Sequence, residues 1–254
     1  MNLNTYSINL SGSRIFRAAG VGLCVCAALA ANATPVALQN ATATYSQTAD
    51  SLAGVGIVIN GAPNNTEGWG VSPFEGVNQT AAFQTVQNVG FAGGSRLTFT
   101  LDQFFTLNLE TLGDFRISVT TDDRSTFANG LITGGDVTAN WTVLNPISAV
   151  SQNGTTLTIE GDGSVLASGA SPATDIYTIE ADTALTGITG FRLEALANAS
   201  LPHNGPGRQP LNGNFTLSQF GVDITPYTVP EPATCALALV GGGLAWLRRR
   251  GTRA

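Results

Sequence analysis

The chain has 254 residues, 17 of them acidic and 11 basic, and a formal net charge of −6. All basic residues are arginines. Five arginines and sixteen acidic residues fall between positions 34 and 228, which gives this interval a formal charge of five minus sixteen, or −11. Such a surface repels nucleic acid and anionic lipid. It is compatible with bound Ca²⁺, although solubility alone also explains it.

The N-terminus carries the pattern of a signal peptide over residues 1–33. Two arginines precede an apolar stretch over 18–31, and small residues stand at Ala31 and Ala33, the positions that a signal peptidase reads. We expect cleavage after Ala33. A retained membrane helix is the alternative, for which the apolar run is short.

Alternating polar and apolar residues in the body predict antiparallel strands. Within 96–101, Leu97, Phe99 and Leu101 share one face and polar side chains take the other. Similar stretches occur at 115–119, 156–159, 177–179, 191–193 and 215–217. Turn formers such as Asn153-Gly154 separate them. This pattern predicts an all-β fold of the antiparallel β-sandwich or jelly-roll type.

A glycine-rich stretch over 126–136 interrupts the pattern and predicts a boundary between residues 34–125 and 136–226. The landmarks of the first part are Asn60-Gly61, Gly68-Trp69-Gly70 and Ala81-Ala82-Phe83. This part resembles the discoidin-like or galactose-binding-like jelly roll. The landmarks of the second part are Trp141-Thr142-Val143-Leu144 and Gly190-Phe191-Arg192-Leu193-Glu194. It is similar to a companion module of large secreted bacterial proteins. We favour two tandem β-sandwich modules over one elaborated sandwich.

The C-terminus, residues 229–254, combines a short motif, an apolar run and a basic end. These are Val229, Pro230, Glu231 and Pro232, then residues 233–247, then Arg248, Arg249 and Arg250. As a helix, the run would reach about 22 Å, which is short of the roughly 30 Å hydrocarbon core. The arginines favour the cytoplasmic side, and the prolines keep Glu231 extended and accessible. The sequence therefore predicts a temporary membrane anchor.

This order of parts resembles the PEP-CTERM sorting tail of exported bacterial proteins, a signature also described as an ice-binding protein C-terminal domain. The resemblance implies that an exosortase recognises Pro230-Glu231-Pro232 and removes the helix and the basic end. The protein would then pass through the inner membrane to the cell surface or the extracellular matrix. The alternatives are a permanent C-terminal anchor and a buried helix with a basic end.

Catalytic and metal-binding residues are hard to find in the predicted mature body. Cys24, Cys26 and Cys235 all lie in the segments expected to be removed, and His203 is the single histidine. One histidine without cysteine does not make a common zinc site or a Ser/His/Asp triad. We therefore predict no catalytic residue, no resident metal and no cofactor.

Three residues are candidates for ligand binding. Trp69, flanked by glycines, could stack on a sugar ring, or it could close the core. Arg208 and Asn214 could donate hydrogen bonds to a ligand, although turn scaffolding explains them equally well.

We favour a non-catalytic exported protein of the cell surface or matrix that binds polysaccharide or envelope components. A polysaccharide-active hydrolase is the first alternative. It would use carboxylates among Asp122, Asp123, Glu160, Asp162, Glu180 and Asp182. An ice-binding protein is the second alternative, with ranked threonines at 98, 100, 156 and 158.

Overall fold

The computed structural model describes residues 32–49, 52–106 and 109–227. The sorting motif, the apolar run and the basic end at 229–254, like Ala31 and the rest of the predicted signal peptide before it, lie outside the described residues. Ala33 is exposed and immediately precedes the first strand. No helix within the described ranges has the length and apolar character needed to cross a membrane.

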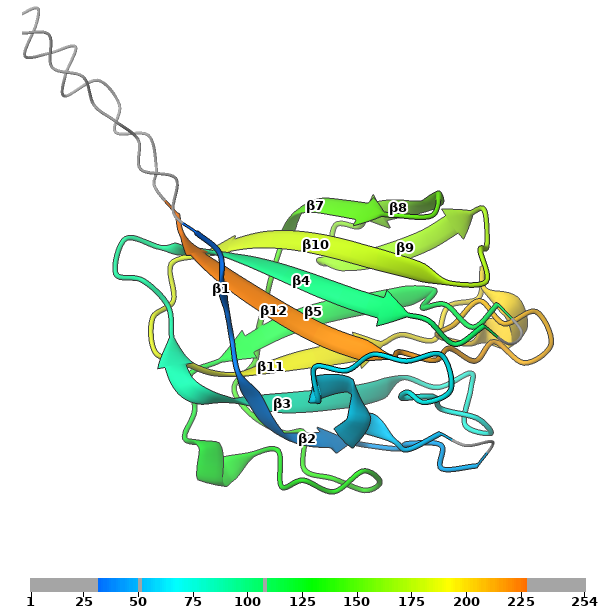
Figure 1. Cartoon of the computed structure of the whole chain (residues 1–254), viewed down its shortest axis with the longest axis horizontal. Helices are drawn as coiled ribbons and strands as arrows, with labels where there is room; N and C mark the ends of the chain where they lie inside the picture. The colour runs from blue at the N-terminus through cyan, green and yellow to red at the C-terminus, as the bar shows by residue number, and fades with distance from the viewer. Residues whose placement is uncertain (1–31, 50–51, 107–108, 228–254) are drawn as a thin grey trace, which may run out of the picture. The chain divides into compact units, whose positions relative to one another are not determined.

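The described residues fold into two antiparallel sheets (Figure 1). Sheet A has the order β1 (Thr34–Pro35), β12 (Gln219–Pro226), β4 (Ser95–Gln103), β10 (Asp175–Thr183) and β7 (Pro146–Ser151). Sheet B has the order β2 (Leu38–Ala43), β3 (Gln79–Val89), β11 (Ile188–Ala195), β5 (Asp114–Thr120), β9 (Ser164–Gly169) and β8 (Thr155–Ile159), and β6 (Thr142–Val143) pairs with β5. Three short 3₁₀ turns are η1 (Val55–Ile59), η2 (Arg124–Thr126) and η3 (Pro202–Asn204). The all-β antiparallel prediction is confirmed.

The core lies between the two sheets, and aromatic rings fill it. Phe99 on β4 contacts Phe191 of sheet B edge to face, with ring centroids 5.6 Å apart, and Phe220 of β12 at 5.9 Å. Phe83 of sheet B stacks on the same Phe220 ring at 4.5 Å. The apolar residues of the predicted alternation along β4 therefore pack in a core that both sheets share.

The prediction of two tandem modules at 34–125 and 136–226 is wrong. β4, from the first part, pairs along its length with β10 and β12 from the second. β11, from the second part, pairs with β3 and β5 from the first. Because both sheets contain strands of both parts paired with one another, the described residues share one core, and the alternative of one elaborated sandwich is correct.

The predicted boundary over 126–136 is not a linker. Phe127 and Ala128 are buried against Ala82 on the outer side of β3. The Gln84 amide donates hydrogen bonds to the carbonyl oxygens of Arg124 at 2.6 Å and Phe127 at 2.8 Å. This segment covers part of sheet B.

The strand predicted at 215–217 is not formed. Leu217 makes only an isolated β-bridge with Trp69.

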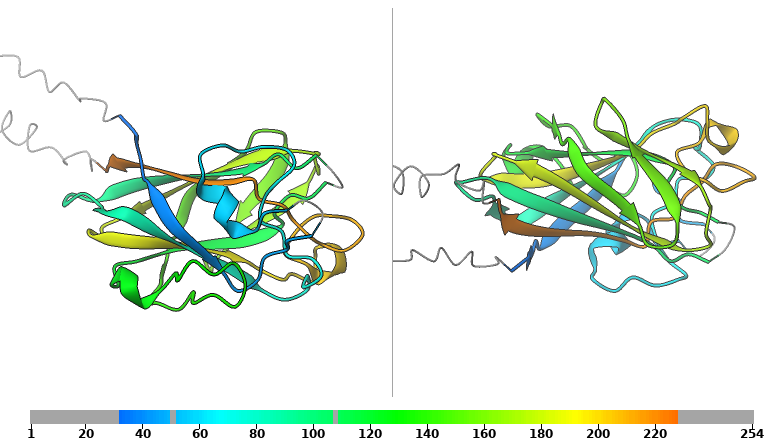
Figure 2. Two further views of the ribbon diagram at one scale, coloured as in Figure 1. Left: turned by 60° about the horizontal axis from the view of Figure 1, so that its bottom comes forward. Right: turned by 90° about the horizontal axis from the view of Figure 1, so that it is seen from above.

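The first and last strands of the sandwich lie side by side. Thr34 is in register with Ile224, and the Val36 amide donates to the Val222 carbonyl at 2.8 Å. The described ends therefore leave the sandwich together, and the long connections β2–β3 and β11–β12 lie at the opposite end (Figures 1 and 2).

A shared core predicts a single cooperative unfolding transition. Phe99→Ala should lower the free energy of unfolding by about 3–5 kcal/mol, because it removes a fully buried ring that joins the sheets. Thr98→Ala, on the outer face of the same strand, is the control and should change it far less. Urea denaturation followed by tryptophan fluorescence measures both. Two separable transitions would contradict the single sandwich.

Candidate functional site

Trp69 does not offer a ring face to a ligand. Its side chain is 0% exposed, its indole N–H donates to the Tyr45 carbonyl at 2.9 Å, and its ring meets Phe215 edge to face at 5.1 Å. The predicted sugar-stacking role is therefore incompatible with its position, and the alternative of a core tryptophan holds.

Arg208 and Asn214 support loops at the end of the sandwich opposite the described termini. Arg208 is 9% exposed at the wall of a cleft of about 480 Å³, and its guanidinium donates to the carbonyl oxygens of Gly169 at 2.8 Å and Ala170 at 2.6 Å. Asn214 is 2% exposed, and its amide donates to Gln47 at 3.1 Å. These bonds fit the scaffolding explanation of both residues.

The carboxylates considered for hydrolysis lie on three separate elements: Asp122 and Asp123 follow β5, Glu160 and Asp162 lie between β8 and β9, and Glu180 and Asp182 lie on β10. Asp122, Asp123 and Asp162 accept hydrogen bonds from the backbone amides of Asn140, Ser125 and Ser164, and Asp182 pairs with Arg96. Within the described ranges, no three His, Cys, Asp or Glu side chains gather as a metal site would require. The threonines at 98 and 100 lie in sheet A and those at 156 and 158 in sheet B, so they do not form one ranked array.

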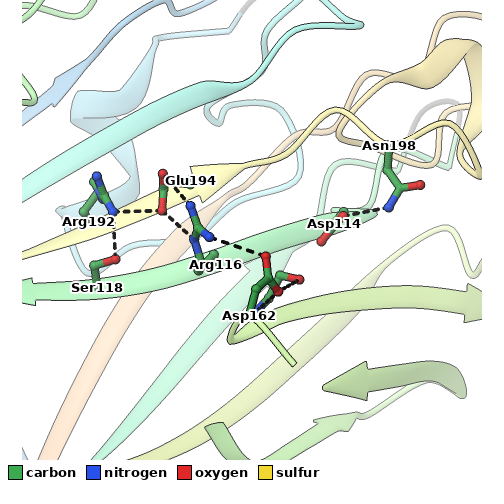
Figure 3. Close-up of polar contacts among 8 residues, drawn as sticks. Asp114, Arg116, Ser118, Asp162, Arg192, Glu194 and Asn198 are labelled. Atoms are coloured by element: carbon green, nitrogen blue, oxygen red, sulfur yellow. Dashed lines mark hydrogen bonds and ion pairs between the residues drawn. The ribbon is translucent and has the colours of Figure 1, made fainter. Parts of the chain in front are cut away.

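A charged cluster lies on the outer face of sheet B (Figure 3). Glu194 accepts hydrogen bonds from Arg116 at 2.9 Å and forms an ion pair with Arg192 at 3.0 Å. Arg116 also reaches Asp162 at 3.4 Å, and the Arg192 guanidinium lies 5.3 Å from the centre of the Trp141 ring. The two arginines and the two carboxylates of this cluster pair with one another, and the Arg116–Glu194 pair links β5 to β11.

A cleft of about 380 Å³ lies on the outer face of sheet A, over strands β4 and β12. We call it the β4–β12 cleft. Its floor consists of four polar residues of the two strands, Thr100, Asp102, Gln219 and Asp223, together with Gly221. The chain crossing from β1 to β2, residues 35–38, and the η1 region at Ile59 and Gly61 form its wall.

The register between β4 and β12 determines which floor residues lie next to one another. Asp102 lies opposite Gln219, and Thr100 lies opposite Gly221. Because side chains alternate between the faces of a sheet, the intervening Leu101 and its partner on β12 point into the core. Gly221 has no side chain, which leaves the centre of the floor open. A Cβ there would come no closer than 3.7 Å to Thr100, so the backbone does not require glycine.

Two hydrogen-bond acceptors in this floor have no partner among the described residues. Asp102 Oδ1 and Gln219 Oε1 are both buried, and neither receives a hydrogen bond from residues 32–49, 52–106 or 109–227. A buried acceptor without a partner costs about 1–3 kcal/mol. Burial also raises the pKa of the Asp102 carboxyl above its ordinary value. Asp102 and Gln219 therefore line the cleft with hydrogen-bonding capacity that the described residues do not use.

Sequence reasoning missed these residues. The alternation over 96–101 continues to Asp102 and places it on the polar face, and an equivalent pattern of Phe220, Val222 and Ile224 would have identified β12. Neither pattern reveals that the two strands are neighbours, because 115 or more residues separate them in the sequence.

No family model and no curated protein matches the chain. Two solved structures are similar to it over 73% of its length. One is CBM32-3 from a family 31 glycoside hydrolase of Clostridium perfringens, with 11% identity, 90% of that chain covered and a TM-score of 0.39. The other is from work on the Streptococcus pneumoniae beta-galactosidase BgaA, with 10% identity, 89% covered and a TM-score of 0.41. This degree of likeness identifies neither a ligand nor an activity for the chain.

Asp102→Asn should stabilise the unliganded protein at neutral pH. The folded protein holds the Asp102 proton more tightly than the unfolded chain does, so the stabilising effect of protonation is present at acid pH and is lost as the pH rises through the raised pKa. An amide never ionises and also brings N–H donors. We expect a gain of roughly 1 kcal/mol at pH 7, which shrinks as the pH falls through the raised pKa and is smallest below the ordinary Asp pKa of 3.8.

Thermal unfolding across the pH range measures this gain. Asp182→Asn is the matched control, because that carboxylate lies on the same face of sheet A but accepts two hydrogen bonds from Arg96. It should not stabilise the protein. Equal destabilisation by both variants would mean that Asp102 has a partner in the folded protein.

Proposed function

We propose that this chain is a non-catalytic exported protein of the cell surface or extracellular matrix that binds carbohydrate in the β4–β12 cleft. In this proposal, signal peptidase removes residues 1–33 and an exosortase processes the tail at 229–254. The unpaired acceptors Asp102 and Gln219 are the observation that carries the binding function.

The chemistry of the cleft floor suits a sugar. A saccharide presents many hydroxyl donors, which would satisfy the Asp102 and Gln219 oxygens, and the Thr100 hydroxyl can both donate and accept. The open floor at Gly221 lets a ring approach the backbone closely. Hydrogen bonds to a carboxylate are stronger than those between neutral groups. These features favour a polyhydroxylated ligand over an apolar one.

The position of the cleft suits a tethered protein. Asp102 and Gln219 lie at the end of the β4–β12 pair away from Ser95 and Pro226, where the chain leaves the sandwich toward the sorting tail. A body held by its C-terminus would present Asp102 and Gln219 away from its point of attachment, while Asp223 and Pro35 line the nearer end of the cleft. Processing at both ends of the body would leave the floor residues untouched.

Gly221→Val should abolish carbohydrate binding without unfolding the protein. Valine suits a strand, the backbone tolerates a Cβ at this position, and the added methyl groups would occupy the open floor. A glycan array and retention on polysaccharide extracted from bacterial cell surfaces, both with the full chain in detergent micelles, measure binding.

Thr156→Val, on the exposed face of β8 in sheet B, is the control and should bind like the wild-type protein. Equal melting temperatures would show that the Gly221 variant remains folded. If the wild-type protein binds no glycan, or if the Gly221 variant binds as well as wild type, the proposed function is wrong. Release of new reducing ends from a bound polysaccharide would instead establish the hydrolase alternative.

Sorting is tested by intact-mass analysis of the exported protein from a host that has an exosortase. The mature wild-type protein should lack Arg248, Arg249 and Arg250. Glu231→Ala should retain them, because it changes the motif that the enzyme is proposed to recognise. Retention of these arginines in the mature wild-type protein would contradict processing of the tail.

A further inference from the structure

The charge of the β4–β12 cleft is one-sided. In the part of the chain that the structure describes, its charged lining residues are the carboxylates Asp102 and Asp223, and no arginine or histidine lines it. The outer face of sheet A continues this negative charge, because Thr98 lies in register between Asp223 on β12 and Glu180 on β10. A ligand on this floor therefore meets negative charge from two neighbouring strands.

The cation closest in register to this floor is already bound. Arg96 lies on the outer face of β4, two residues beyond Thr98, and its guanidinium donates to both Asp182 oxygens, at 2.8 and 3.0 Å. The same guanidinium lies 5.5 Å from the centre of the Tyr227 ring. Arg96 thus pairs with Asp182, and no arginine of the described residues forms an ion pair with Asp102 or Asp223.

Charge distinguishes between the donors that would satisfy Asp102. A sugar hydroxyl and a protonated amine can both donate a hydrogen bond to the carboxylate. Only the amine also neutralises a partly buried negative charge, and an ion-paired hydrogen bond is the stronger of the two. A sugar acid would add negative charge and would be repelled.

Building on the proposed function, we infer that the β4–β12 cleft selects saccharides that carry free protonated amines, such as de-N-acetylated hexosamine polymers. The Asp102 carboxylate accepts the ammonium group, the Gln219 oxygen accepts a neighbouring N–H or O–H, and Asp223 adds longer-range attraction. N-acetylation removes the positive charge and places a bulky neutral amide over the floor.

Calorimetric titration of the full chain in detergent micelles tests this selectivity. The probes are the hexamer of glucosamine, the hexamer of N-acetylglucosamine and a neutral glucose hexamer, at a pH where the amines are protonated. We expect the glucosamine hexamer to bind roughly tenfold more tightly than the other two, the difference between a charged and a neutral hydrogen bond. This preference should shrink as NaCl is added.

Asp102→Asn should remove the preference for the glucosamine hexamer and leave binding of the neutral hexamers within about twofold, since the amide keeps the shape of the floor. Asp136→Asn is the matched control: it removes one negative charge from an exposed loop, and its Oδ1 can still accept the Thr138 N–H. It should bind all three hexamers as the wild-type protein does.

The outcomes separate the two proposals. Equal or tighter binding of the neutral hexamers, abolished by Gly221→Val, overturns amine selectivity and keeps carbohydrate binding. Binding of none of the hexamers or array glycans overturns both. A preference for glucosamine that survives Asp102→Asn, or that Asp136→Asn removes equally, shows general charge attraction and overturns the assignment to this cleft. Displacement of the hexamers by CaCl₂ in the wild type but not in Asp102→Asn identifies a cation site instead and also overturns it.

Discussion

The pairing of β4 with both β10 and β12 is the constraint on which the rest of the structure depends. It draws strands from distant parts of the sequence into one sheet, and it places Phe99 where aromatic rings of both sheets meet. The same pairing brings Asp102 beside Gln219 on the opposite face. One register therefore fixes the core on one side of β4 and the cleft on the other.

Much of the secondary structure could be predicted, and the exceptions have physical causes. Stretches with one buried face, such as 96–101, show the two-residue period and are strands. β3 lacks this period because residues 81–85 are buried on both faces, Ala82 and Gln84 by the 121–141 segment. The glycines at 130, 134 and 135 indicated a linker, but local turn chemistry cannot tell a linker from a loop that packs on a sheet.

The candidate site could not be predicted in the same way. Trp69 has a sequence context that suits an exposed platform and a core position equally well, and only tertiary contacts distinguish them. Asp102 and Gln219 are ordinary polar residues of half-buried strands in the sequence. The two residues are neighbours only because β4 pairs with β12, and residues 35–38 reach the cleft beside β12 only because β1 pairs with β12; both relations depend on the complete topology.

The adjacency of β1 and the end of β12 also determines how the sandwich would carry mechanical load. A pull on the C-terminal end of β12 acts along the strand, whereas its hydrogen bonds to β1 and β4 lie across it. The bonds would then be sheared together instead of opening one after another. A protein held at this end, with a polymer bound over β4 and β12, would carry the tension along these two paired strands.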